Sequence, residues 1–486
     1  MAEGIYDVIM IGAGAVGCAI ARELSRFEIR TLVLEKECDV AYGISGRMSG
    51  VVHSGFNNKP GTLMAKLCVE GNRGFETVCK ELDIPYRKTG KVLVAFDDQD
   101  IKALERMIAQ GIENGCEGLT MIDADDIRAI APRIRGIGGM LSANTAIFDP
   151  FEYCIAHAEN AMVNGVDFSF ESKVTAIEKQ DDIFIVQTVK DKFRGMYIIN
   201  SAGMYCDKIS AMLGIDQYKI YPCRGQYYIL DNVADKLLDI PAYPVPKPGI
   251  GGLGIHITPT IEGNLILGPS AEYLEEPDDH GTTSRVMERL LKEAKELLPS
   301  IDQKYIIGNY SGIRPKQAPS GEGGFRDFVI KEEEECPGFI NLIGIESPGF
   351  TASVPIARMV RDILAQHVEL KEKKSFRPVR KGPIRFRDLS LEEQERLIEQ
   401  DSEYGEIVCR CRNVTKREIK DAIQNMFGSR SLSSIKYRAW CMTGRCNGGY
   451  CMTKIVDILI HEYGMKAQEI AYRGMDSEMF VGEVKG

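Results

Sequence analysis

The sequence contains no run of about 20 consecutive apolar residues, so no segment is expected to cross a lipid bilayer as a helix. Its one apolar stretch near the start, residues 8–21, lacks a basic leader and is interrupted by three glycines, which predicts a strand and a helix instead of an export signal. Lysine and arginine are fewer than aspartate and glutamate, and the resulting formal net charge of −10 argues against a general nucleic-acid-binding protein. We therefore expect a cytoplasmic protein, with attachment to the inner face of a membrane through partner subunits left open.

Histidine is scarce, with six residues, whereas cysteine is plentiful, with fourteen. Because no export signal is present, the cysteines are expected to stay reduced and to serve metals or chemistry instead of disulfides. A chain of 486 residues is too long for one ordinary hydrophobic core, so two or three domains are expected.

The first forty residues have the pattern of a βαβ unit. An apolar strand is expected over residues 6–11, a helix follows it, and a second strand ends at Glu35. Between the first strand and the helix stand Gly12, Gly14 and Gly17, in the G-x-G-x-x-G spacing of dinucleotide-binding turns. Such glycines permit the tight turn, the approach of a diphosphate to the positive end of the helix, and close packing of helix on strand. Glu35 stands where a carboxylate accepts hydrogen bonds from an adenosine ribose.

A second match to the same glycine pattern, at residues 249–254, is rejected as a dinucleotide site. It follows three closely spaced prolines instead of a strand, and an alternating strand instead of a helix comes after it. Without a second credible turn, no nicotinamide site is expected.

A loop rich in small residues, 43–50, follows the βαβ unit and leads into His53. With that unit, the loop resembles the flavoprotein superfamily of D-amino-acid oxidase and glycerol-3-phosphate dehydrogenase, whose cofactor is FAD. The resemblance implies that residues 43–55 pass along the isoalloxazine ring. Together with the glycine turn it implies these cofactor-binding residues: Gly12, Gly14, Ala15, Val16, Gly17, Glu35, Lys36, Ser45, Gly46, Arg47, Ser49, Gly50, Val174, Ala202, Gly203, Gly312, Arg314, Pro348, Gly349, Phe350 and Thr351.

The predicted fold class is α/β: a Rossmann-like FAD-binding domain with an interleaved antiparallel-sheet substrate domain, plus a small helical C-terminal domain that carries a cysteine cluster. Within it, residues 62–83 are expected to form a helix and residues 174–186 a hairpin. The expected boundaries are 1–84, 146–205 and 316–368 for the discontinuous FAD-binding domain, 85–145 and 206–315 for the substrate-binding domain, 369–400 for a charged linker, and 401–486 for the ferredoxin-like domain and tail.

Four cysteines near the C-terminus stand in two tight pairs, Cys409 with Cys411 and Cys446 with Cys451, on glycine-containing loops between short helices. Four thiolates in this arrangement suit a [2Fe–2S] cluster or a zinc ion. Their spacing resembles the small bacterioferritin-associated ferredoxin module, which implies the cluster, and structural zinc is the alternative. Cys441 is an extra nearby thiol, so an exchanged ligand stays open.

An alcohol-oxidising flavoenzyme needs a base for the hydroxyl proton, and histidine serves without a large pKa shift. The resemblance puts His53 and His256 at the flavin face, although a hydrogen-bonded structural role is an equal alternative for each. Arg314 is the candidate for binding an anionic group of the substrate, because its planar fork matches a carboxylate or a phosphate. These three residues form the predicted catalytic set, and Arg224 and Lys316 are weaker candidates for the anion.

The expected substrate rests on resemblance alone. The domain plan resembles the catalytic subunit of anaerobic glycerol-3-phosphate dehydrogenase over almost the whole chain. Local segments around His53, Arg224, His256 and residues 347–349 look more like L-2-hydroxyglutarate oxidases, and a Gly-Gly-Lys segment of the glycerol-3-phosphate enzymes is absent at 344–351. Both candidate substrates are small anions with an oxidisable secondary alcohol.

The leading hypothesis is therefore an FAD and [2Fe–2S] dehydrogenase for glycerol 3-phosphate first and L-2-hydroxyglutarate second. It would pass electrons to a partner subunit or a quinone-linked partner within a hetero-oligomer. The alternatives are an amine or imino-acid dehydrogenase, an electron-transfer subunit without a substrate site of its own, and, for the tail, a zinc-stabilised docking module.

Overall fold

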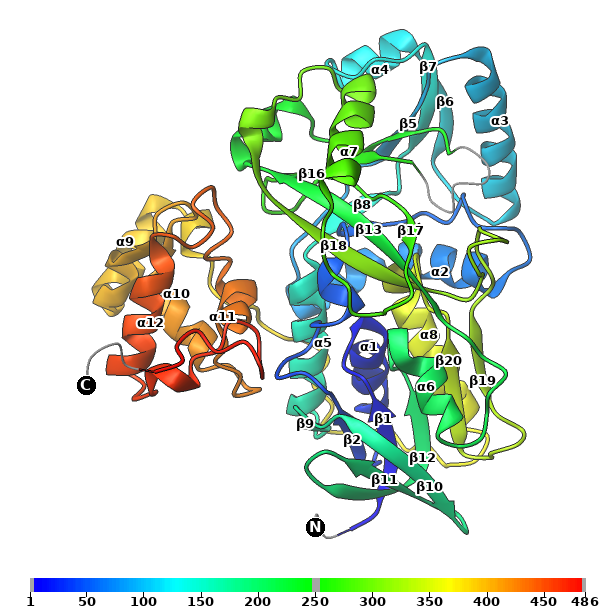
Figure 1. Cartoon of the computed structure of the whole chain (residues 1–486), viewed down its shortest axis with the longest axis vertical. Coiled ribbons are helices and arrows are strands. Elements are labelled where there is room, and N and C mark those ends of the chain that lie inside the picture. Colours follow the sequence, from blue (N-terminus) through cyan, green and yellow to red (C-terminus); the bar gives the residue numbers. More distant parts are fainter. Residues whose placement is uncertain (1–3, 247–253, 483–486) are drawn as a thin grey trace. The chain divides into compact units, whose positions relative to one another are not determined.

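The computed structural model describes residues 4–246 and 254–482 (Figure 1). The chain divides into two units. The first comprises the chain up to Leu34 together with Ala41–Arg380, and the second comprises Glu35–Val40 together with the chain from Lys381 onward. Residues 249–253, which belong to the rejected glycine match, lie outside the described residues.

An eight-stranded sheet with a parallel centre forms one half of the first unit. β1 (Tyr6–Ile11) lies between β2 (Thr31–Leu34) and β12 (Lys192–Asn200), and β20 (Phe339–Ile343) extends the parallel set beyond β12. β10 and β11 pair antiparallel, which confirms the predicted hairpin. The other strands of this sheet are β9 (Asp167–Ser169), β10 (Val174–Gln180), β11 (Ile183–Thr188) and β19 (Val329–Glu332). Central strands such as β2 are buried along their whole length, as parallel strands covered by helices require.

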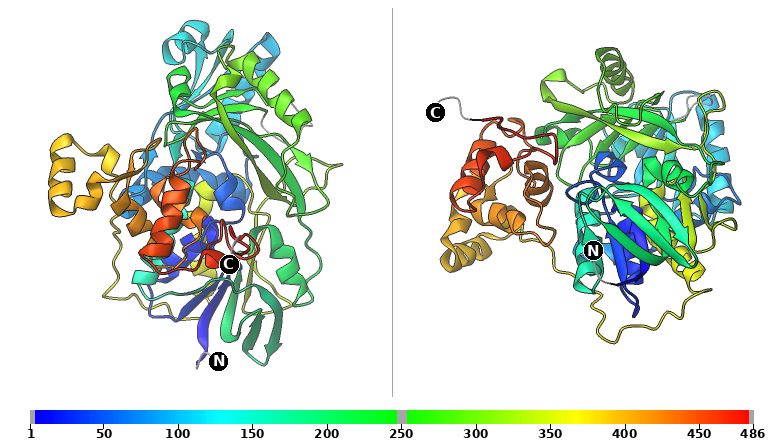
Figure 2. Two further views of the ribbon diagram at one scale, coloured as in Figure 1. Left: turned by 60° about the vertical axis from the view of Figure 1, so that its left-hand side comes forward. Right: turned by 60° about the horizontal axis from the view of Figure 1, so that its bottom comes forward.

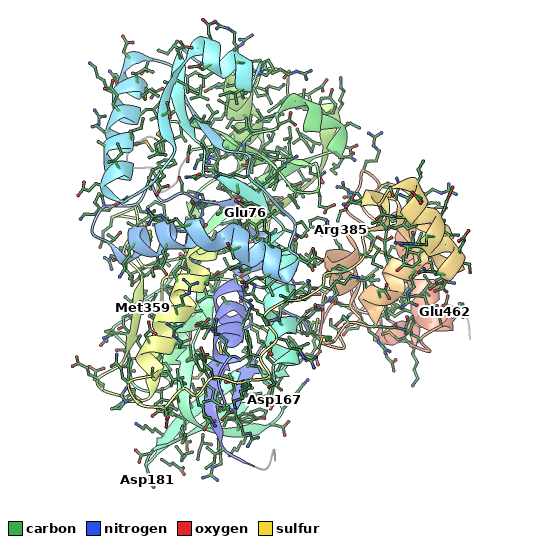
Figure 3. All side chains as sticks on the ribbon, turned by 180° about the vertical axis from the view of Figure 1, so that it is seen from behind. Glu76, Asp167, Asp181, Met359, Arg385 and Glu462 are labelled. Carbon is green, nitrogen blue, oxygen red and sulfur yellow. The ribbon has the colours of Figure 1, made fainter. Side chains whose placement is uncertain are left out.

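Helices pack closely against one another on this sheet. α1 contacts α5 and α8, and α8 also contacts α2. A Cβ on Gly71 of α2 would lie 1.9 Å from the carbonyl oxygen of Thr351 in α8, so only glycine allows this approach. Figure 3 marks the two helices by Glu76 and Met359. The helices of this half are α1 (Ala15–Leu24), α2 (Leu63–Leu82), α5 (Pro150–Val163), α6 (Cys206–Ala211) and α8 (Gly349–Leu364).

A nine-stranded sheet forms the other half of the first unit. Its pairs are antiparallel, as predicted, except that β14 pairs in parallel with β5. α3 (Asp98–Glu113), α4 (Ala124–Ile130) and α7 (Ser284–Leu297) accompany it. Its strands are β5 (Lys91–Ala95), β6 (Leu119–Asp123), β7 (Gly138–Ser142), β13 (Tyr221–Leu230), β14 (Ala242–Pro244), β15 (His256–Pro259), β16 (Leu265–Gly268), β17 (Glu272–Tyr273) and β18 (Ile306–Lys316).

Within the first unit, Figure 1 shows the parallel sheet at the bottom and the β5–β7–β6 edge of the second sheet at the top, with α2 between them. The left view of Figure 2 shows the same separation. A small sheet of β3 (Val51–Val52), β4 (Tyr86–Arg87) and β8 (Ala146–Phe148) joins segments from both halves. This fold is the α/β class with an interleaved second sheet that the sequence predicts.

The second unit is small and mainly helical, as predicted. Its core gathers buried apolar side chains and the thiols of Cys409, Cys441 and Cys451. Residues 391–400 of the predicted linker form a helix, and the boundaries drawn from the sequence remain a proposal. The elements are α9 (Leu391–Gln400), β21 (Ile407–Cys409), β22 (Val414–Thr415), α10 (Lys416–Ile423), α11 (Leu432–Ala439) and α12 (Cys451–His461).

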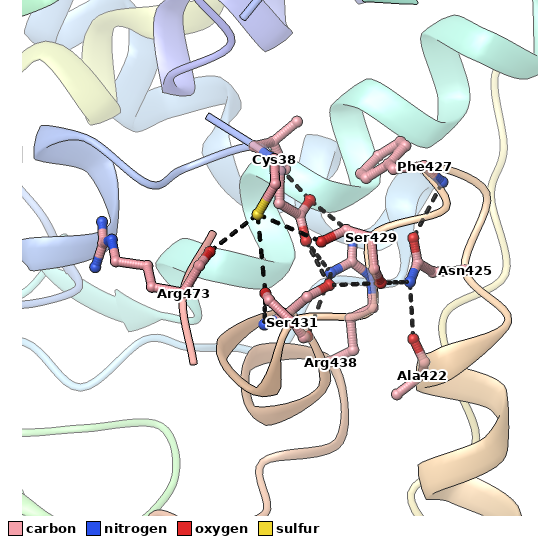
Figure 4. A network of polar contacts seen from close by, with 11 residues as sticks. Cys38, Ala422, Asn425, Phe427, Ser429, Ser431, Arg438 and Arg473 are labelled. Atoms are coloured by element: carbon pink, nitrogen blue, oxygen red, sulfur yellow. Dashed lines mark hydrogen bonds and ion pairs between the residues drawn. The ribbon is translucent and has the colours of Figure 1, made fainter. Parts of the chain in front are cut away.

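The hexapeptide Glu35–Val40 is held inside this second unit by a buried polar network (Figure 4). The carboxylate of Asp39 accepts hydrogen bonds from Nη2 of Arg438 at 2.9 Å and from Oγ of Ser434 at 2.6 Å. The thiol of Cys38 donates to the carbonyl oxygen of Arg473 at 2.9 Å. Each buried charge has its partner, as burial of an ion pair requires.

Candidate functional site

The glycine turn after β1 has the geometry that a bound diphosphate needs. Gly12 has a φ of +103°, and its N–H donates to the carbonyl oxygen of Leu34 at 2.8 Å, which ties the turn to the end of β2. A Cβ on Gly12 would lie 2.7 Å from the carbonyl oxygen of Ser201, and one on Gly17 would lie 2.1 Å from that of Gly12. Side chains are therefore excluded at Gly12 and Gly17, and the surface of the turn is formed by backbone atoms.

The N-terminus of α1 opens onto this surface. Gly14 is the N-cap and supplies no side-chain cap, and the first turn carries no acidic residue. Ala15 and Val16 are the first two residues of α1. The N–H of Ala15 donates to Oγ of Ser45 at 2.9 Å, so the loop of residues 43–50 lies against the glycine turn. The backbone N–H groups and the positive helix end suit a diphosphate, and these residues fit FAD.

The other predicted cofactor residues do not all lie at this turn. Ala202 lies beside it, since a Cβ on Gly12 would be 3.2 Å from its Cα. Gly203 has a φ of +57°, which favours glycine. Val174 instead packs in the apolar cluster under β1 and β2, so only its backbone remains as a contact for an adenine. Glu35 and Lys36 follow β2 directly and belong to the second unit, where Lys36 pairs with Glu37.

The loop expected along the flavin presses against β18. A Cβ on Gly312 would lie 2.3 Å from the carbonyl oxygen of Arg47, and Nη1 of Arg47 donates to the carbonyl oxygen of Ser311 at 3.2 Å. A Cβ on Gly46 would lie 2.4 Å from the carbonyl oxygen of Ala41. Gly50, next to Ser49, has a φ of +69°. These contacts hold the loop in one conformation beside the strand that carries Arg314.

The N-terminus of α8 holds the other predicted flavin contacts. Pro348 is its N-cap and Gly349 its first residue. The ring of Phe350 packs 5.3 Å from the ring of Phe148, centroid to centroid. Oγ1 of Thr351 accepts the backbone N–H of His53 at 3.0 Å, which joins this helix to the predicted catalytic loop.

His53 is held by several hydrogen bonds around its ring and backbone. Its Nε2 lies 3.3 Å from Oγ of Ser347, and its carbonyl oxygen accepts from the side-chain amide of Asn72 at 3.1 Å. Burial and the charge of Lys91 lower the pKa of His53 to about 3. The imidazole is thus neutral at physiological pH and can accept a proton.

His256, at the start of β15, stacks on Tyr243 with ring centroids 3.6 Å apart. Its Nδ1 is buried and has no hydrogen-bond partner among the described residues. Burial, then the charges of Lys91, His53 and Arg314, lowers the pKa of His256 well below its usual value. His53 and Arg314 thus each lie within electrostatic range of His256.

The guanidinium of Arg314 contacts groups that carry no charge. Its Nη2 donates to the carbonyl oxygen of Ser270 at 3.1 Å and its Nη1 lies 3.8 Å from Sγ of Cys223. Gly225, on the neighbouring strand, leaves the space, since a Cβ there would be 2.8 Å from Nη2. No carboxylate among the described residues forms an ion pair with Arg314, so it can bind an anion.

The two weaker anion candidates have structural partners. Arg224 pairs with Glu272 and Asp279, both at 2.7 Å. Lys316 is fully buried and pairs with Glu346 at 3.0 Å. Their charges are already neutralised within the protein.

Sequence reasoning missed Lys91, a buried cation whose charge lowers the pKa values of both His53 and His256. It opens an otherwise apolar strand, and that interruption is the one signal the sequence offers. Ser347 and Tyr243, which contact the histidine rings, were missed as well.

The four predicted cluster thiols lie as two pairs. Sγ of Cys411 and Sγ of Cys446 are 3.5 Å apart, and a hydrogen bond from the thiol of Cys451 lowers the pKa of Cys409 to about 6. Among the described residues, no group of three or more His, Cys, Asp or Glu side chains has the arrangement of a single metal-ion site. In a [2Fe–2S] cluster with four cysteines, each iron takes two thiolates, so two pairs fit the cluster. A Cβ on Gly444 would lie 2.2 Å from Cβ of Cys411, so glycine is needed beside this thiol.

Comparison with known families agrees with both sites. The profile described as FAD dependent oxidoreductase matches residues 7–363. The profile described as BFD-like [2Fe-2S] binding domain matches residues 407–461. The matched ranges contain the glycine turn and the four cluster cysteines respectively.

Individual relatives point to alcohol-oxidising enzymes. The chain is 37% identical over 486 residues to glycerol 3-phosphate dehydrogenase from Caloramator mitchellensis, and the match covers 99% of each chain. It is 30% identical over 392 residues to L-2-hydroxyglutarate dehydrogenase from Indibacter alkaliphilus, covering 73% of this chain and 98% of the relative. The solved structure of dithionite-reduced L-alpha-glycerophosphate oxidase from Mycoplasma pneumoniae with FAD bound superposes with a TM-score of 0.74 at 28% identity, covering 79% and 100% of the two chains.

Proposed function

Since the chain belongs to the FAD dependent oxidoreductase family and carries a BFD-like [2Fe-2S] binding domain, we propose that it is a dehydrogenase for glycerol 3-phosphate. The observation that carries this proposal is the similarity to the Caloramator enzyme, which extends over 99% of both chains and includes the cysteine region. The chain is an FAD-dependent oxidoreductase that acts on a CH–OH donor, and the proposal adds the identity of the donor.

The cofactors supply the redox chemistry, and the residues of the chain bind the substrate, orient it and remove its hydroxyl proton. When bound, FAD takes two electrons together from a carbon that bears a hydroxyl group, and a [2Fe–2S] cluster carries one electron at a time. In the proposed reaction the substrate loses a hydride and a proton as its secondary alcohol becomes a ketone. Nε2 of His53 takes the hydroxyl proton, and Ser347 orients that nitrogen.

Arg314 binds the anionic group of the substrate in this proposal. Its guanidinium contacts the Cys223 thiol, the carbonyl oxygen of Ser270 and the hydroxyl of Tyr227, and a phosphate oxygen is a stronger acceptor than any of these. His256 lies within electrostatic range of Arg314, and its Nδ1 has no hydrogen-bond partner among the described residues. An anion there would offset the positive charges that depress the pKa values of both histidines.

A second candidate substrate is L-2-hydroxyglutarate. The relative from Indibacter supports it over 73% of this chain, although that match covers less of the chain than the first. Both substrates present an anionic group next to a secondary alcohol, so the same residues would serve.

The proposed electron acceptor is a partner subunit or a quinone-linked partner in a hetero-oligomer. The [2Fe-2S] domain supports an exit route for single electrons, because a flavin oxidised by dioxygen alone needs no such relay. None of the helices in residues 4–246 and 254–482 has the length and hydropathy needed to span a bilayer. Attachment to the inner face of a membrane through partner subunits is part of the same proposal.

Steady-state turnover with an artificial electron acceptor tests the substrate proposal. We expect turnover with glycerol 3-phosphate and a kcat/KM above that for L-2-hydroxyglutarate. A higher value for L-2-hydroxyglutarate would transfer the assignment to the second candidate. Turnover only with sarcosine or proline, or with no small molecule at all, would reject both.

A further inference from the structure

Lys91 is a buried cation that neither the fold nor the proposed chemistry explains. It is the first residue of β5, and only 2% of its surface is exposed. Its Nζ lies 4.6 Å from the ring centroids of both Phe56 and Tyr243. A buried ammonium is costly unless it is paired, and two aromatic faces supply only part of the missing hydration.

No carboxylate among the described side chains forms an ion pair with Lys91. The side chain that acts on the pKa of Lys91 is that of Cys68, on α2, and burial raises the pKa of this thiol so that it stays uncharged. Other buried cations of this chain differ: Lys316 pairs with Glu346, and Arg380 pairs with Glu152. Lys91 is therefore an ammonium group without a protein counter-ion.

The groups around Lys91 are uncharged or positive. Tyr243 contacts Lys91 through its ring and also stacks on His256. The charge of Lys91 reaches both His53 and His256, and Arg314 reaches His256 as well. Among the described residues neither Lys91 nor Arg314 forms an ion pair. The carboxylate of Glu346 also acts on Arg314, but it is paired with Lys316. With the unpartnered, buried Nδ1 of His256, the cluster is therefore suited to receive negative charge from outside the chain.

We propose that Lys91 is a second anion-binding residue of the substrate site, which holds an anionic oxygen of the substrate together with Arg314. The proposal rests on the proposed function only for the identity of the substrate. A phosphate would share its oxygens between the two cations, whereas a dicarboxylate could give one carboxylate to each. In either case, binding neutralises the charge that acts on His53 and leaves the imidazole a stronger base.

The test compares holoenzymes of Lys91→Met, Lys91→Arg and the control Lys304→Met. Lys304 is an exposed lysine, so its change removes the same charge away from the cluster. We expect Lys91→Met to lower kcat/KM by roughly 10- to 100-fold, mainly through KM, since a hydrogen bond to a charged group is worth that factor. Lys91→Arg should recover part of the loss, and Lys304→Met should match the wild type.

A binding measurement separates this inference from the proposed function. Inorganic phosphate and glutarate are each titrated into the oxidised holoenzymes, and the change in flavin absorption reports binding. Weaker binding of either anion to Lys91→Met, by roughly 10-fold or more, supports the inference even if neither candidate substrate is turned over. Preferential loss of phosphate or of glutarate tells which kind of anion the pair of cations holds.

The pH dependence of glutarate binding adds an independent check. Burial lowers the pKa of Lys91 to about 8, so its charge and the affinity it supports decrease as the pH rises through 8. The facing groups do not titrate there, because burial lowers the pKa values of His53 and His256 and raises those of Tyr243 and Cys68. We expect this loss of affinity in the wild type and its absence in Lys91→Met. Wild-type affinity and KM in flavin-loaded Lys91→Met would overturn the inference, even if the variant were less stable.

Discussion

At the scale of single residues, two buried histidines, His157 and His256, and the partly exposed His53 differ in their partners. His53 faces Ser347 through Nε2, His256 stacks on Tyr243, and His157 bonds the carbonyl oxygen of Tyr153 through Nδ1 at 2.8 Å. Burial is the first cause of a lowered pKa in each case, so all three are neutral at physiological pH. The neighbours, more than the protonation state, distinguish a candidate base from a structural residue.

The first prediction concerns the proposed base. His53→Gln is expected to lower kcat by about 10²- to 10⁴-fold, the range for loss of a general base, while the purified variant keeps its flavin. His157→Gln is the matched control, because it also removes an imidazole but one that lies buried on α5 with a backbone partner. Pre-steady-state flavin reduction by substrate measures the effect. Equal reduction rates in the two variants would exclude His53 as the base.

The second prediction is acid destabilisation through His157. Its pKa is about 3 in the folded protein, against 6.5 for an ordinary histidine, because burial disfavours the charged form. Its contribution to stability is therefore complete above pH 6.5 and decreases as the pH falls toward 3, by about 1.4 kcal/mol for each pH unit. Between pH 7 and pH 5 the unfolding free energy of wild type should fall by on the order of 2 kcal/mol more than that of His157→Gln. Denaturant titrations followed by flavin release measure this difference, and equal losses would contradict it.

At the scale of elements, the glycine turn and the helices near it are the part of the fold that local sequence determines. The βαβ unit, the helix at Leu63–Leu82 and the hairpin at residues 174–188 follow from periodicity, caps and turn residues. The parallel pairing of β14 with β5 does not, because the two strands are far apart in the chain. Pairing over such distances is set by packing that a local pattern does not encode.

The same limit applies to the candidate site. Gly12 and Gly17 could be predicted because their spacing itself expresses the geometry of the turn. The pairing of the cluster cysteines could not, because the structure brings Cys411 beside Cys446 and Cys409 beside Cys451 instead of the neighbours in sequence. Arg224 looked like an anion site because its partners, Glu272 and Asp279, lie about fifty residues away in sequence. Lys91 was missed because a lysine in an apolar strand has the same local pattern whether it faces solvent or a pocket.

The third prediction tests the glycine turn as an element. In Gly17→Ala the new Cβ would lie 2.1 Å from the carbonyl oxygen of Gly12, so the turn must open and the flavin should be lost. Gly74→Ala is the matched control, since a Cβ at this position of α2 meets no atom within 4 Å. That variant should keep its flavin and gain about 0.5–1 kcal/mol of stability from better helix propensity. The ratio of flavin to protein absorption decides, and full flavin content in Gly17→Ala would contradict the account.

At the scale of the whole molecule, the chain combines a two-electron cofactor fold with a one-electron module. The first unit contains the glycine turn that fits FAD, and the second contains the two pairs of thiols. Glu35–Val40, which follows β2 of the first unit in sequence, belongs to the second unit through Asp39 and Arg438. The boundary between the units is therefore crossed three times by the chain.

The fourth prediction tests the one-electron module. Anaerobically purified wild type should contain two irons per chain and the visible absorption of a [2Fe–2S] cluster. Cys446→Ala should lose the iron and keep the flavin, whereas Cys441→Ala, which removes a buried thiol outside the predicted set, should keep both. Zinc in place of iron in the wild type would contradict the assignment of a [2Fe–2S] cluster. Loss of iron in Cys441→Ala would show that Cys441 is one of the cluster ligands.

Mixing oxidised holoenzyme with glycerol 3-phosphate without oxygen in a stopped-flow instrument tests whether the substrate reduces the flavin. We expect rapid bleaching of the flavin, followed by partial loss of the cluster absorption. A flavin that dithionite bleaches but that glycerol 3-phosphate leaves fully oxidised would contradict this expectation.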